Sequence, residues 1–96
     1  MAFGITHFFS GGTASQYEAT LAAVHPSRDE LPEGQLFHAA GPVEGGWLIC
    51  AVHDSKESWE AFRDNTLMPN MQAGIEGGLE GPPQETAFEV HHMGHS

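Results

Sequence analysis

The stretch WLICAV, residues 47–52, contains no polar side chain at either parity of a β-strand. Successive residues of a strand point to opposite faces of a sheet, so a strand with one wet face alternates apolar and polar residues. An uninterrupted apolar run of this length, followed directly by a helical pattern, predicts instead a strand that is buried on both faces.

Around this strand, the spacing of apolar residues changes period several times along the chain. Tyr17, Leu21 and Val24 are spaced as one face of a helix. The predicted elements are, in order, a strand Phe3–Phe9, a helix Thr13–Val24, a strand Gln35–Gly41, a turn Pro42–Gly46, a strand Trp47–His53, a helix from Ser55 and a strand Thr86–His92. This βαββαβ order predicts an α+β, ferredoxin-like sandwich, in which a four-stranded antiparallel sheet carries both helices on one face. We expect the first and third strands to be central and to run parallel to each other.

Local signals mark the helix boundaries. Thr13 with Gln16 three residues later is a capping-box pattern, and Asp54 with Glu57 is a similar pattern before the second helix. Pro69 should end that helix, kink it, or begin a short third helix, because proline lacks the backbone N–H that a helix interior needs.

Composition sets the outer limits on function. The chain has 96 residues, of which 40% are apolar, so we predict one domain over residues 1–96. No apolar run approaches the roughly 18 residues of a membrane span. Met1–Gly4 carry no basic segment and Cys50 is the single cysteine, so we expect a cytoplasmic protein. The formal charge of −10 repels phosphate backbones and anionic membranes, which disfavours nucleic-acid and membrane partners.

The apolar third strand also predicts a partner. With helices on one face of the sheet, its second apolar face is left bare, and a chain of this length buries only about 60 to 65% of its surface alone. Pairing two sheets face to face would cover that surface. We therefore expect a homodimer.

Histidine carries the candidate chemistry. The chain has seven histidines, and His7, His38 and His53 fall in predicted strands or at their ends. Imidazoles on a sheet face could act as general bases near neutral pH or bind a metal. The alternative is a set of hydrogen-bonded core or interface histidines, which is common for this residue type. Strand register, which one sequence does not fix, decides between these readings.

The C-terminal sequence His91-His92-Met93-Gly94-His95 is a separate case. Its imidazoles could chelate zinc, nickel or copper. Terminal segments are often poorly ordered, and no second cysteine or histidine pair has structural-zinc spacing. We therefore predict no physiological metal site and no cofactor.

Residues 47–63, WLICAVHDSKESWEAFR, and the order of the predicted elements are similar to those of a known protein family. The chain resembles the dimeric α+β barrel superfamily, especially small antibiotic-biosynthesis-monooxygenase-like proteins. The resemblance implies a barrel formed by two sheets across a dimer, with a ligand cavity between sheet and helices in each subunit. Members include cofactor-independent oxygenases of polyaromatic substrates, polyketide cyclases and haem-degrading enzymes.

Two positions depart from the pattern of these relatives. Phe62 occupies the place near which many monooxygenase-like members carry a histidine, and Gly4–His7 lack the asparagine of the haem-degrading members. Haem degradation is therefore disfavoured, and a strand histidine would have to replace the missing polar group.

The sequence thus predicts a homodimer that binds a small aromatic or polyketide-like molecule, with cofactor-independent oxygenation or cyclisation as the reaction. The alternative is a non-catalytic ligand-binding or metal-binding dimer. The candidate catalytic residues are His7, His38 and His53, and the candidate ligand-binding residues are Tyr17, Trp47, Trp59 and Phe62.

Overall fold

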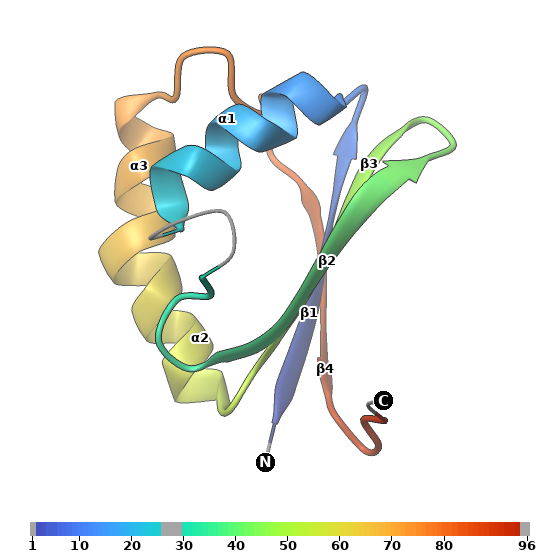
Figure 1. The fold of residues 1–96 in the computed structure, drawn as a ribbon, viewed down its shortest axis with the longest axis vertical. Coiled ribbons are helices and arrows are strands. Elements are labelled where there is room, and N and C mark those ends of the chain that lie inside the picture. The colour runs from blue at the N-terminus through green and yellow to red at the C-terminus, as the bar shows by residue number, and fades with distance from the viewer. Residues whose placement is uncertain (1, 26–29, 95–96) are drawn as a thin grey trace.

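The computed structural model describes residues 2–25 and 30–94 (Figure 1). Within these ranges the predicted order of strands and helices is confirmed. The elements are β1 (Phe3–Ser10), α1 (Ala14–Val24), β2 (Gln35–Val43), β3 (Gly46–His53), α2 (Lys56–Phe62), η1 (Arg63–Leu67), α3 (Met68–Ala73) and β4 (Gln84–Glu89). The fold is therefore the predicted α+β, ferredoxin-like one.

The described strands form one antiparallel sheet in the order β2-β3-β1-β4. The strands β1 and β3 are central neighbours, as expected, but the expectation that they run parallel is wrong. The α1 crossover returns the chain so that β2 has the direction of β1, and a tight turn with Gly45 at φ 85° then reverses β3. A short hairpin can join only antiparallel strands.

Thr13 caps α1 as predicted. Its side chain accepts the Gln16 backbone N–H at 3.2 Å, and the Gln16 side chain accepts the Thr13 N–H at 3.1 Å. The cap predicted at Asp54 lies one residue later, because Ser55 accepts the Ser58 N–H at 3.0 Å. The Asp54 N–H instead donates to a carbonyl in the loop before β2, directly after the last residue of β3.

The helices α2 and α3 are joined by η1, one π-helical turn. The Met68 N–H donates to the Arg63 carbonyl five residues earlier, which is the hydrogen bond that defines such a turn. A short third helix, α3, is present as the third role considered for Pro69 requires, but it begins at Met68, so Pro69 is its second residue and not its first.

The last strand is shorter than predicted. β4 ends at Glu89 rather than at His92, because its partner β1 begins at Phe3, which pairs with Glu89. Only the Val90 N–H continues the pairing, to the Ala2 carbonyl. His91 and His92 follow outside the sheet and are exposed.

All described helices lie on one side of the sheet (Figure 1). The core between the layers is built around Ile5, Ala51 and Trp59. The opposite face of the sheet is uncovered in the single chain and carries large apolar side chains, among them Phe37, Leu48 and Phe88. Within one chain, the open face of β3 is covered only at Val52, while Leu48 is exposed, so the predicted burial along both faces would need a partner. No described helix is long and apolar enough to span a membrane.

Candidate functional site

A cavity of about 360 Å³ lies between the sheet and the helices. Its sheet wall includes Ile5, His7 and Ile49, its α1 wall includes Tyr17 and Leu21, and the helices after β3 close the other side. The volume falls within the roughly 300 to 1,000 Å³ of small-molecule pockets, and most of the lining side chains are apolar, as in such pockets.

The structure brings five of the seven predicted site residues to this cavity: His7, Tyr17, His38, Trp59 and Phe62. It does not bring His53 or Trp47 there. Trp47 lies behind Tyr17, with ring centroids 5.3 Å apart, and is buried. His53 is fully buried at 0% exposure, with its ring 5.5 Å from that of Trp59.

His7 forms a pair with Glu85 of β4. Its Nε2 lies 3.1 Å from Glu85 Oε2, and its ring lies 5.5 Å from that of Trp59. The two residues face each other across the β1–β4 ladder. Because a carboxylate only accepts hydrogen bonds, His7 donates through Nε2–H, which leaves Nδ1 as the basic nitrogen. Burial lowers the pKa of His7, while the hydrogen bond and charge of Glu85 act in the opposite direction.

Tyr17 and His38 form a second polar pair. Tyr17 Oη lies 2.6 Å from His38 Nε2, and the His25 ring packs edge-on against His38 at 4.8 Å. The pKa of His38 is lowered to about 4, mainly by burial, with smaller contributions from the neighbouring His25 and His53. His38 is therefore neutral near pH 7, and its imidazolium is disfavoured.

His53 has the environment of a core histidine. Its Nε2 lies 3.2 Å from Nε2 of the buried Gln35, and Trp59 and Phe62 cover its ring. Burial lowers its pKa, and Asp54 acts in the opposite direction. His53 Nδ1 and Gln35 Oε1 have no hydrogen-bond partner among the described residues. The pair therefore supports the packing behind the cavity.

Sequence reasoning missed several residues that line the cavity. His25 is one of them: it is the C-cap of α1, is buried and faces His38. Burial lowers its pKa, and a hydrogen bond with the Glu30 backbone opposes this shift. Glu85 was not singled out, although a known register would have placed it opposite His7. Gln35 and Arg63 were also missed.

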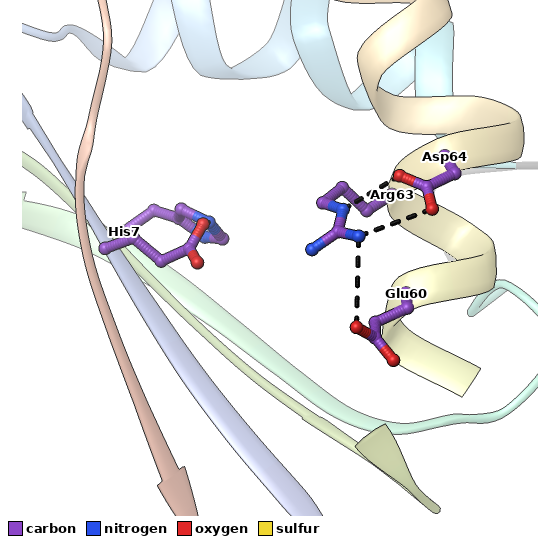
Figure 2. A network of polar contacts seen from close by, with 5 residues as sticks. His7, Glu60, Arg63 and Asp64 are labelled. Atoms are coloured by element: carbon purple, nitrogen blue, oxygen red, sulfur yellow. Dashed lines mark hydrogen bonds and ion pairs between the residues drawn. The ribbon is translucent and has the colours of Figure 1, made fainter. Parts of the chain in front are cut away.

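Arg63 is the lining residue of η1 that carries a positive charge. Figure 2 shows its guanidinium extending from the helix in the direction of His7. It donates to Asp64 Oδ1 at 2.9 Å and to Oδ2 at 3.3 Å, and Glu60 Oε2 lies 4.0 Å away. The hydrogen bond with Asp64 raises the pKa of Arg63 and lowers that of Asp64.

Metal ligands are sparse in the part of the chain that the structure describes. Over residues 2–25 and 30–94, no three His, Cys, Asp or Glu side chains converge as a metal site would require. The expectation for the tail includes His95, which lies outside the described residues.

Two solved structures are similar to this chain. The protein Rv0793 of Mycobacterium tuberculosis superposes with a TM-score of 0.68 at 15% identity, covering 97% of this chain and 98% of its own. A candidate antibiotic biosynthesis monooxygenase from Chloroflexus aurantiacus J-10-fl superposes with a TM-score of 0.65 at 19% identity, covering 100% of this chain and 98% of its own. The chain shares the fold of these two proteins over nearly its whole length. No protein-family model matches the sequence, and no curated protein does so.

The resemblance expected from residues 47–63 is therefore confirmed for the fold of nearly the whole chain. The cavity lies where the resemblance predicted one, between sheet and helices. Phe62, at the position where a histidine was expected from relatives, contributes an apolar ring to the cavity wall. The histidines of the cavity wall come instead from β1, β2 and the end of α1.

Proposed function

We propose that the protein binds a small aromatic or polyketide-like molecule in the 360 Å³ cavity and removes a proton from it with a strand histidine. The resemblance suggests two outcomes, cyclisation or cofactor-independent oxygenation. In the second, dioxygen oxidises the resulting carbanion, so that an activated ring CH₂ becomes a carbonyl and one molecule of water leaves.

The observation that carries this proposal is the His7–Glu85 pair on the cavity wall. A carboxylate that accepts the Nε2–H of an imidazole fixes its tautomer and stabilises the imidazolium formed when Nδ1 takes up a proton. Among the described residues, no carboxylate is hydrogen-bonded to His38 in this way. Its pKa of about 4 means that protonation near pH 7 would cost about 4 kcal/mol, so we assign it a different role.

Tyr17 and His38 are suited to orient the ligand. Their short contact places two groups that can donate and accept hydrogen bonds on the wall formed by α1 and β2. A carbonyl or hydroxyl group of the ligand could bind there while its ring system packs on apolar side chains. A few placed polar groups in an apolar pocket are what fixes ligand orientation. Trp59 and Phe62 shape the opposite wall.

We also propose that the working form is a homodimer. The exposed apolar side chains of Phe37, Leu48 and Phe88 lie on three strands of the open sheet face. A second copy packed on this face would remove them from water. This would also complete the burial of β3 that its sequence predicts.

The proposal is tested by titrating a hydroxylated anthrone into the protein and following tryptophan fluorescence and oxygen uptake. We expect saturable binding and protein-dependent oxygen consumption. His7→Gln and Glu85→Gln should lower turnover at least about 100-fold, in the range of a lost general base. His92→Gln, an exposed histidine outside the sheet, is the matched control and should behave as wild type.

Binding without turnover in the wild type would favour the alternative of a non-catalytic ligand-binding protein. Equal turnover in His7→Gln and wild type would refute the assignment of His7 as base. Absence of any binding would refute the cavity as the site.

A further inference from the structure

The charges around the cavity indicate which ligands it prefers, and this inference rests on the function proposed above. Apart from its histidines, the described residues that line the cavity include two with charged side chains, Glu85 and Arg63. Glu85 lies on β4 and is 47% exposed, although it accepts the His7 hydrogen bond. A carboxylate has about four lone-pair positions, so that bond leaves it able to accept from a ligand as well.

Arg63 offsets this negative charge only in part, because its guanidinium, which interacts electrostatically with Glu85, is shared with two further carboxylates. Asp64 binds its guanidinium with two hydrogen bonds, and Glu60 lies 4.0 Å away on the preceding turn (Figure 2). One guanidinium therefore faces three carboxylates, those of Asp64, Glu60 and Glu85. The formal charge of the whole chain, these groups included, is −10. A cavity within such a field attracts cations and repels anions, most strongly at low salt.

The aromatic walls act in the same direction. Trp59 and Phe62 line the cavity, and the ring of Trp59 lies 5.5 Å from the imidazole that holds Glu85. The faces of aromatic rings attract cations. A positively charged group near Glu85 would therefore contact a carboxylate and lie close to an indole.

We infer that Glu85 is a specificity-determining residue that makes the cavity prefer ligands with a positive charge, such as an aromatic ring carrying a protonated amine. The ring system would occupy the apolar part of the cavity between Ile5 and Leu21. The ammonium group would donate to the carboxylate of Glu85 at the β4 side. An isosteric carboxylic acid would be repelled.

Three naphthalene probes of similar shape test this inference by calorimetry: 1-naphthylmethylamine, 1-naphthalenemethanol and 1-naphthoic acid. At about 10 mM salt we expect the amine to bind at least about five-fold more tightly than the alcohol, and the acid to bind most weakly, because one contact between unit charges near a protein surface is worth at least this factor. At about 0.5 M salt the differences should shrink.

Two variants separate Glu85 from the overall charge. Glu85→Gln and Glu89→Gln each remove one negative charge from β4, but Glu89 does not line the cavity. Glu85→Gln should reduce the ratio of amine to alcohol affinity to about one, and Glu89→Gln should preserve it. Equal ratios in the two variants would overturn the inference, and so would tighter binding of the acid. If none of the three probes binds, the proposed function fails together with the inference, whereas binding without this order of affinities refutes the inference alone.

Discussion

Acid should destabilise the folded protein through His38, and the structure gives the size of the effect. The pKa of His38 is about 4 in the folded chain, against 6.5 for an unperturbed histidine. The unfolded state therefore binds more protons than the folded state between these values, so stability falls as pH falls. Well above pH 6.5 the ring is neutral in both states, so His38 causes no loss of stability there.

A factor of ten in proton affinity corresponds to about 1.4 kcal/mol, so the full loss below pH 4 is about 3 kcal/mol. About 2 kcal/mol of this appears between pH 7 and pH 5. For a domain of this size, that lowers the midpoint of thermal unfolding by roughly 8 to 16 °C. Burial lowers the pKa values of His7, His25 and His53 as well, so the wild-type loss should be larger still.

The assay is urea unfolding at pH 7 and pH 5, at one protein concentration, for wild type and His38→Gln. Glutamine cannot titrate but keeps a polar partner for Tyr17. The loss between the two pH values should be about 2 kcal/mol smaller in the variant, because titrating carboxylates cancel in this comparison. His92→Gln, which removes an exposed ring, should keep the wild-type loss. If His38→Gln loses as much stability as wild type, His38 does not have the proposed environment.

Three other predictions concern assembly, the tail and the core. Light scattering at micromolar concentration should give a dimer of about 20 kDa, twice the 10.3 kDa of the chain. Leu48→Glu should give a monomer, because it places a charge on the open sheet face. A monomeric wild type would contradict the proposed homodimer. Deleting residues 91–96 should abolish any tight zinc, nickel or copper binding. The circular dichroism spectrum should show that the fold is preserved, because β4 ends at Glu89. Stoichiometric metal binding after the deletion would show that the metal site lies elsewhere in the domain. His53→Phe should lower the free energy of unfolding by roughly 1 to 3 kcal/mol, because it leaves Gln35 buried and unpaired, and it should leave ligand affinity unchanged. Weaker ligand binding at wild-type stability would show that His53 contributes to the cavity.

The fold could be predicted from the sequence because its signals are local. The reciprocal cap of Thr13 and Gln16 and the stripe of Tyr17 and Leu21 act within a few residues of each other. The relative direction of β1 and β3 is not local, since it depends on how a crossover and a hairpin combine, and there the prediction failed.

The site was less accessible to sequence reasoning, for physical reasons. His7 and His53 share a face of the sheet, yet His53 lies at a strand end, where Trp59 and Phe62 cover it, while His7 lies mid-strand beside the cavity. The pairing of His7 with Glu85 joins residues 78 positions apart through strand register alone. One sequence contains no signal for such a pair.

The π-helical turn η1 affects how this chain can be aligned with its relatives. A π-helical turn commonly arises by inserting one residue into an α-helix without breaking it. Removing one residue there would rotate every later side chain of the helix by about 100°, including Leu67, Met68 and Met71 of the cavity wall, while Trp59 stayed in place. Alignment to a relative whose helix is regular therefore needs a one-residue gap within Arg63–Leu67. Without this gap, functional assignments for residues after Phe62 would be transferred to the adjacent residue in the sequence.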